Sequence, residues 1–208
     1  MHRQLRNDNS LVQIKEYQNN KEEVLSIAYL ENKAVVKRKY GELLYRLAKY
    51  FNAKNIVEIG TSIGISSAYI SASNPDARII SLDNLSALTD LVIQNHALLK
   101  IRNVELKQGE FSGILNSSFQ QLGFLDIIFF NRCFHESETL QHFYQCLNYI
   151  TENSIFIFNN IYQDREANEM WIKIQQHPQI SLTIDVFQFG ICFFRKGKLA
   201  KENFVLRY

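Results

Sequence analysis

The stretch that most constrains the fold of this chain is Asn55–Ser67, where a short apolar run leads through a glycine-containing turn into a helical segment. The run Ile56–Ile59 is rich in β-branched residues and is typical of a buried strand. Gly60 ends this run, and Gly64 directly precedes Ile65–Ala72, which has a helical pattern. Glycine accepts positive φ and lets a ligand approach the backbone, while a helix N-terminus presents N–H groups and a positive dipole. The stretch therefore predicts either a ligand-binding turn or an ordinary βα turn.

The spacing of the glycines distinguishes between classes of cofactor. A dinucleotide fingerprint, G-x-G-x-x-G, would require glycine at Ser62 and a small residue at Ile65, so the sequence argues against a nicotinamide oxidoreductase. The segment Val57–Gly64 instead resembles the first motif of class I S-adenosylmethionine-dependent methyltransferases. This resemblance implies that the methionyl end of the cofactor is held by Glu58, Gly60, Thr61, Ser62 and Gly64.

Composition limits the compartment and the partners. A chain of 208 residues with 46% hydrophobic residues fits one domain with a substantial core. The formal net charge of +2 is too small to indicate a nucleic-acid or membrane partner, and no apolar run has the length of a membrane span. The N-terminus lacks the apolar core of a signal peptide. Cys133, Cys146 and Cys192 show no C-x-x-C spacing, so we expect reduced thiols in a cytoplasmic protein, without a zinc site.

From about residue 53 onward, β-rich and helical segments alternate. The expected strands are Ile56–Ile59, Arg78–Leu82, Val104–Lys107, Leu125–Phe130 and Ser154–Phe158, followed by two β-rich runs, Ile180–Gln188 and Ile191–Arg195. The expected helices lie near Ile65–Ser73, Ser86–Leu99, Ser112–Gln121, Glu138–Ile150 and Asp164–Gln176. This order predicts an α/β, Rossmann-like fold, with a mostly parallel sheet, helices on both faces and a C-terminal antiparallel hairpin.

The N-terminal part is expected to be a helical addition to this core. Ser10 is a candidate cap for a helix that runs to about Leu30, and apolar residues recur at helical spacing over Ala34–Phe51. We therefore predict a single domain, 1–208, with an N-terminal helical segment, 1–52, and a core, 53–208.

Two candidate cofactor contacts follow the second and third strands of this core. In such sheets ligands bind at the carboxyl ends of the strands. Asp83 lies 19 residues beyond Gly64, near the spacing at which a carboxylate meets a ribose diol. Gly109 and Glu110 stand where the methyltransferase resemblance implies contact with adenine. A plain turn aspartate and a solvent-facing glutamate are the alternatives.

The resemblance extends from about Lys39 to Tyr208 and points to a bacterial class I methyltransferase family, related in fold to catechol O-methyltransferase. It rests on five segments: Lys39–Gly41, Glu58–Ile65, Phe129–His135, Phe158–Ile161 and Phe193–Lys196. It implies S-adenosyl-L-methionine as the cofactor and an O or N atom of a small molecule as the methyl acceptor. Lys39–Gly41 is either part of a solvated basic helix face or a segment that helps to close the cofactor pocket.

The acceptor half departs from the pattern of this family. Asn131 replaces the usual Asp after the fourth strand, and Asn159 and Asn160 replace the carboxylates after the fifth, which are metal positions in the catechol relatives. A neutral amide cannot act as a general base or balance a divalent cation, so we expect metal-independent chemistry. His135 is the one group in this half that titrates near neutrality, and we take His135 and Asn131 as the catalytic candidates. A loop histidine bonded to backbone is the alternative.

Two functions remain open from the sequence. One is a methyltransferase that acts on a small molecule, without nucleic acid or membrane, and with oligomerisation left open. The other is a non-catalytic protein of the same fold that binds S-adenosylmethionine or a protein partner only. Cys133 shows no feature that would activate a thiolate. We expect Asp126 to be structural, because it begins the fourth strand, and Asp164 to cap a helix.

Overall fold

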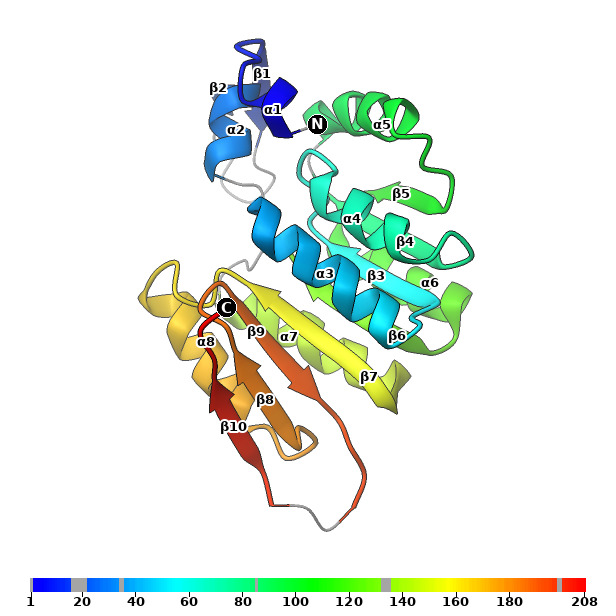
Figure 1. Cartoon of the computed structure of the whole chain (residues 1–208), viewed down its shortest axis with the longest axis vertical. Coiled ribbons are helices and arrows are strands. Elements are labelled where there is room, and N and C mark those ends of the chain that lie inside the picture. Colours follow the sequence, from blue (N-terminus) through cyan, green and yellow to red (C-terminus); the bar gives the residue numbers. More distant parts are fainter. Residues whose placement is uncertain (1, 16–21, 34–35, 85, 132–135, 198–199) are drawn as a thin grey trace.

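The computed structural model describes residues 2–15, 22–33, 36–84, 86–131, 136–197 and 200–208 (Figure 1). Its centre is an eight-stranded sheet in the order β10-β8-β9-β7-β6-β3-β4-β5. The strands are β3 (Asn55–Ile59), β4 (Arg78–Asp83), β5 (Val104–Gln108), β6 (Leu125–Phe130), β7 (Ile150–Asn159), β8 (Leu182–Asp185), β9 (Phe189–Phe193) and β10 (Glu202–Val205). β9 runs antiparallel to β7 and β8, and the other neighbouring pairs are parallel. This confirms the predicted mostly parallel sheet with a C-terminal hairpin.

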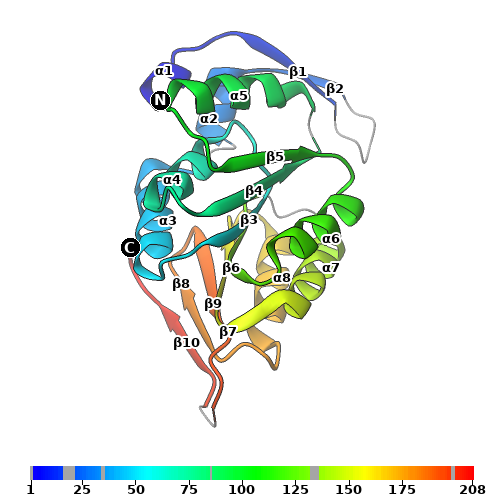
Figure 2. The same ribbon diagram turned by 90° about the vertical axis from the view of Figure 1, so that its right-hand side faces the viewer.

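Helices cover both faces of the sheet (Figure 2). α3 and α4 pack on one face, with α5 beside α4, and α6, α7 and α8 pack on the other. Their bounds are α3 (Arg38–Tyr50), α4 (Ile65–Ser73), α5 (Thr89–Leu98), α6 (Phe111–Leu122), α7 (Glu136–Cys146) and α8 (Arg165–Gln176). Short 3-10 turns, η1 (Ser86–Leu88) and η2 (Leu147–Tyr149), precede α5 and follow α7.

Side chains of the central strands alternate between the two faces of the sheet, and this explains why the strand sequences are apolar throughout. In β3, Ile56 packs toward α3 and α4, whereas Val57 packs toward α6 and α7. In β6, Phe129 and Phe130 divide in the same way, and Phe130 stacks on Phe158 with ring centroids 4.4 Å apart. Since successive side chains point to opposite faces and both faces are covered, the strands read as nearly continuous apolar runs.

The register of the parallel strands brings the predicted site positions to one edge. Ile59 pairs with Leu82 on one side and with Phe130 on the other, and Phe130 pairs with Phe158. The residues that follow these positions, namely Gly60, Asp83, Asn131 and Asn159, therefore lie along the carboxyl edge of the sheet.

The predicted helix over Ser10–Leu30 is wrong. The described N-terminal elements are α1 (His2–Leu5), the antiparallel strands β1 (Leu11–Lys15) and β2 (Glu22–Ser26), and α2 (Ile27–Lys33). Val12 pairs with Leu25, and both pack against a cluster that includes Ile63 and Leu88 from the core. Tertiary packing against the core therefore decides this segment over its partial helical periodicity.

Two smaller differences concern the C-terminus and the helix ends. The C-terminal residues Glu202–Val205 form an additional strand that the sequence analysis did not predict, β10, the edge strand that pairs in parallel with β8. The expected helix over Glu138–Ile150 begins at Glu136, and β7 already starts at Ile150. Within the described residues, no helix combines the length and the apolar character needed to cross a bilayer.

Candidate functional site

The turn between β3 and α4 is tightly wound. Gly60, Ser62 and Gly64 have φ values of 95°, 54° and 79°, so three of its five residues are in the left-handed region. Gly64 is also the N-cap of α4, and a Cβ added to it would lie 2.9 Å from both His96 Nε2 and Val92 Cγ1. Glycine is therefore required at Gly64 by both conformation and space.

The N–H groups of this turn are already engaged. The Gly60 N–H donates to the Leu82 carbonyl (2.8 Å), and the Gly64 N–H donates to the Thr61 carbonyl (3.0 Å). The Ser62 N–H donates to Asp83 Oδ2 (2.9 Å). The expectation of free N–H groups is therefore wrong for these three residues. The same bond shows that the structure brings Asp83 and the turn together, as the spacing predicted.

Glu58 lies beneath the turn. Its side chain is fully buried, and its two carboxylate oxygens accept hydrogen bonds from the Ser66 and Ser81 hydroxyls. Burial raises the pKa of Glu58 to about 8; the two hydroxyl bonds oppose this rise and the charge of Asp83 adds to it. Glu58 is thus mostly protonated at neutral pH, and it supports the turn from within the core.

His96, on α5, is a site neighbour that the sequence analysis missed. It is buried, and Nε2 lies 3.0 Å from Ser67 Oγ and 3.3 Å from the Gly64 carbonyl. Burial lowers the pKa of His96, so the imidazole is mainly neutral near pH 7. No sequence signal separates it from a surface histidine of a helix, because its place behind Gly64 depends on how α5 packs on α4.

The predicted adenine region also adjoins Asp83. The Gly109 N–H donates to the Asp83 carbonyl (3.2 Å), which joins the end of β5 to the end of β4. Glu110 is exposed at the N-cap of α6, and its carbonyl accepts from Gly113 and Ile114. The contact of Gly109 and Glu110 with adenine stays a prediction.

On the acceptor side, three amide side chains form one hydrogen-bonded series, which we name the amide chain: Asn131, Asn159 and Gln188. Asn131 Nδ2 donates to the Gly60 carbonyl (2.7 Å) and to Ser66 Oγ (3.2 Å). Asn159 Nδ2 donates to Asn131 Oδ1 (3.1 Å), and Gln188 Nε2 donates to Asn159 Oδ1 (3.1 Å). The amide chain therefore links the turn after β3 to the turn between β8 and β9.

The side-chain oxygen atoms of the amide chain are poorly suited as ligands for Mg²⁺. Asn131 and Asn159 are 8% and 1% exposed, and their carbonyl oxygens already accept bonds from neighbouring amides. Mg²⁺ usually requires one or two carboxylates. No group of three or more His, Cys, Asp or Glu side chains suited to a metal occurs among the residues that the structure describes.

The remaining acceptor-side candidates are placed as follows. Asn160 has a φ of 57°, and its N–H donates to the Gln188 carbonyl (2.7 Å). His135 and Cys133 lie outside the described residues. Asp185, which the sequence analysis missed, is buried at the end of β8 and accepts from the Tyr162 hydroxyl, which raises the pKa of Tyr162 to about 12.

Two acidic residues have the structural roles that were predicted. Asp126 Oδ2 accepts from the N–H groups of Lys54 (2.8 Å) and Asn55 (2.9 Å), at the edge of the sheet opposite the site. Asp164 caps α8 by accepting from the Ala167 N–H (2.8 Å).

Lys39–Gly41 is only in part a solvated face, because Lys39 is exposed whereas Tyr40 and Gly41 are buried. Lys39 is exposed and donates to the Tyr208 carbonyl, and the Tyr40 hydroxyl donates to the Val186 carbonyl (2.8 Å). Gly41 lies under the Tyr69 ring. The residues are thus used in packing against the C-terminal segment and α4, and their hydrogen bonds do not involve the turn after β3.

Comparison with known proteins gives one family and one fold. A family model described as "O-methyltransferase" matches residues 10–185. The chain is 24% identical over 106 residues to ribosomal RNA small subunit methyltransferase G of Glaesserella parasuis, covering 47% of the chain and 50% of that protein. It is 25% identical over 117 residues to the enzyme of the same name from Actinobacillus pleuropneumoniae, covering 52% and 55%. The chain thus spans about half the length of the curated relatives that it matches.

Two solved structures illustrate the fold. The O-methyltransferase TomG from Streptomyces achromogenes, in complex with SAM, has a TM-score of 0.66 at 18% identity, covering 78% of the chain and 82% of TomG. An O-methyltransferase from Bacillus cereus, in complex with SAH, has a TM-score of 0.66 at 19% identity, covering 79% and 84%. At these identities the likeness shows a shared architecture.

Proposed function

The chain belongs to the O-methyltransferase family, and on this premise we propose that it is an S-adenosylmethionine-dependent methyltransferase whose cofactor lies along the Gly60–Gly64 turn. The observation that carries the proposal is the bond from the Ser62 N–H to Asp83 Oδ2, which unites the turn with the carboxylate after the next strand. The similar fold of SAM-bound and SAH-bound O-methyltransferases supports it.

Each cofactor residue then has a physical role. Gly60 leaves the turn without a side chain where the methionyl end approaches, and Gly64 lets the turn pack closely against His96 and Val92 of α5. Asp83, held in place by the Ser62 N–H, accepts hydrogen bonds from the ribose hydroxyls. Gly109 and Glu110 lie on the adenine side, and Glu58 acts as a positioning residue beneath the turn.

The chemistry required of the protein is mainly alignment. S-adenosylmethionine, when bound, supplies an activated methyl group on a sulfonium. The chain holds this group and an O or N acceptor of a small molecule in line, which removes the entropic cost of bringing two reactants together. Asn131 and Asn159 fix the wall of the acceptor side as neutral amides, so the proposed transfer is metal-independent. His135 remains the candidate base for an acceptor that must lose a proton.

Specific observations favour two other functions. The amide chain satisfies its own hydrogen bonds, which suits a protein that binds the cofactor without catalysis. The relatives named as ribosomal RNA methyltransferases suggest an RNA acceptor. The small net charge of +2 is the reason that we place a small molecule first.

The test begins with thermal unfolding in the presence of S-adenosylmethionine and its demethylated product. We expect both ligands to raise the melting temperature of the natural chain and to have little effect on Asp83→Ala. Asp76→Ala, an exposed turn aspartate, is the matched control and should respond like the natural chain. Absence of a shift with either ligand in the natural chain would overturn the proposal. A thermal shift without methyl transfer to phenol, amine or RNA acceptors would favour the non-catalytic alternative. Methyl transfer to RNA would favour an RNA methyltransferase.

A further inference from the structure

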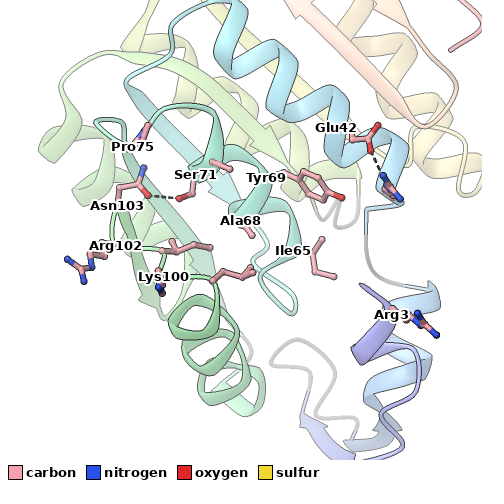
Figure 3. Close-up of a pocket in the computed structure, with 14 residues that line it drawn as sticks. Arg3, Glu42, Ile65, Ala68, Tyr69, Ser71, Pro75, Lys100, Arg102 and Asn103 are labelled. Carbon is pink, nitrogen blue, oxygen red and sulfur yellow. Dashed lines mark hydrogen bonds and ion pairs between the residues drawn. The ribbon is translucent and has the colours of Figure 1, made fainter. Parts of the chain in front are cut away.

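An open groove of about 1030 Å³ lies over the outer side of α4 (Figure 3). The aliphatic part of its lining includes Ile65, Ala68 and Ala72, which share one face of α4 because they are spaced by three and four residues. Leu99 and Ile101, from the segment between α5 and β5, add to it, and Leu99 is 45% exposed. The groove lies outside the turn, Asp83 and the amide chain, none of which lines it.

The edges of this groove are cationic. Lys100 and Arg102 lie on one side of α4, and Arg3 and the Arg38–Glu42 pair (2.9 Å) lie on the other (Figure 3). Four basic side chains thus line the groove with one carboxylate. Within the described part of the chain, Arg3, Lys100 and Arg102 have no ion-pair partner. The groove therefore combines an aliphatic floor with an excess of positive charge.

We propose that this groove binds a small amphipathic anion, an unbranched apolar chain with a carboxylate or phosphate head group. The apolar chain lies along Ala68 and Ala72, and the head group lies at Lys100 and Arg102. Charge complementarity selects an anion, and the aliphatic floor selects a chain that gains from leaving water. The proposal does not depend on methyl transfer.

The lining argues against two larger occupants. Sites for single-stranded nucleic acid stack successive bases on several aromatic rings. This groove offers Tyr69, and one side of its ring is covered, since a Cβ on Gly41 would come within 2.3 Å of Tyr69 Cε2. A stable protein partner would need about 800 Å² of surface on each side. The groove volume, about 1030 Å³, instead slightly exceeds the upper limit of the usual range of small-molecule pockets, roughly 300–1,000 Å³.

The test is calorimetric titration of the full chain with decyl phosphate and with decanoate, each below its micelle concentration. Decanol and decyltrimethylammonium are the neutral and cationic controls. We expect one-to-one binding of at least one anion and weaker binding of both controls. The comparison of the two anions assigns the head group. Failure of both anions to bind, or equal binding of decanol, would overturn the proposal.

Variants locate the binding. Ala72→Glu places a carboxylate on the exposed floor, and the double variant Lys100→Glu/Arg102→Glu reverses the charge at one side. Each should weaken binding of the anion by about tenfold or more. Ala97→Glu, on an exposed position of α5 outside the groove, and Lys49→Glu/Lys54→Glu are the matched controls and should bind like the natural chain.

Equal affinity in all variants would place the ligand elsewhere and refute the proposal. If neither anion binds but a short oligouridine does, and the groove variants abolish that binding, the groove is a nucleic-acid site and the proposal of an amphipathic anion is refuted. The thermal shift with S-adenosylmethionine is measured on the same variants. Since the groove residues lie outside the turn, that shift should persist, so either proposal can fail alone.

Discussion

Replacing Glu58 by glutamine should make the protein less sensitive to rising pH. The side chain is fully buried and its pKa is raised from 4.5 to about 8. Because the folded-state pKa lies above the unfolded value, the folded state binds the proton more tightly. The stability from Glu58 is therefore fully present below pH 4.5 and is lost progressively as pH rises to about 8.

The size of the effect follows from the same shift. One pKa unit corresponds to about 1.4 kcal/mol, so between pH 5.5 and pH 7.5 the natural chain should lose about 2–3 kcal/mol of unfolding free energy through Glu58 alone. Glutamine carries no proton to lose. Its oxygen accepts from Ser66, and its NH₂ donates to Ser81 Oγ, whose hydroxyl turns to Thr61 Oγ1, 2.7 Å away. The polar cluster thus stays satisfied.

The assay is urea unfolding of both chains at several pH values in this window. The burial-lowered pKa values of His96 and His142 give an opposite pH trend in both chains, so the difference between the two curves isolates Glu58. Glu152→Gln, on an exposed part of β7, removes a carboxylate from a position in solvent and is the control. Parallel curves for Glu58→Gln and the natural chain would refute the reasoning.

Four further predictions concern the turn, the amide chain and the need for a metal. Gly64→Ala, at a φ of 79° and with its Cβ 2.9 Å from His96 Nε2, should cost about 1–3 kcal/mol in urea unfolding and abolish the thermal shift with S-adenosylmethionine. Asp83→Ala should weaken cofactor affinity by about 1–3 kcal/mol in calorimetry, and unchanged affinity would remove Asp83 from the site. A chelator should leave cofactor binding and any transfer unchanged, whereas rescue by Mg²⁺ after chelation would contradict the metal-independent assignment. Asn159→Asp should destabilise the fold by about 1–3 kcal/mol, since a carboxylate would then face Asn131 Oδ1 at 3.1 Å.

The core of the fold was predictable because its signals are local. The strand Leu125–Phe130 and the helix Ile65–Ser73 have the predicted bounds. Each is marked by a buried apolar run or by an adjacent glycine, and neither depends on a distant partner. The N-terminal hairpin was missed because its strands are stabilised by contact with Ile63 and Leu88, which the local pattern of residues 10–30 does not encode.

In the candidate site, the proximity of Gly60 and Asp83 was predictable for a similar reason. Gly60 directly follows β3 and Asp83 is the last residue of β4, and the parallel register of these strands brings them together. Ser62 and His96 were missed in their structural roles. The left-handed φ of Ser62 and the burial of His96 arise from how α4 and α5 pack, and neither residue type signals that arrangement on its own.

The acceptor half shows why a change of residue type can mislead when it is considered one position at a time. From the sequence, Asn131 and Asn159 are neutral amides at positions where the family pattern has carboxylates. In the structure each has also gained an NH₂ donor, and these donors bind the Gly60 carbonyl and Asn131 Oδ1. Two carboxylates could not make these bonds, because neither would donate and the two charges would repel. Gln188 completes the arrangement by donating to Asn159. The three amides therefore act as a unit, and changing one asparagine back to aspartate leaves its neighbour without a hydrogen-bond donor.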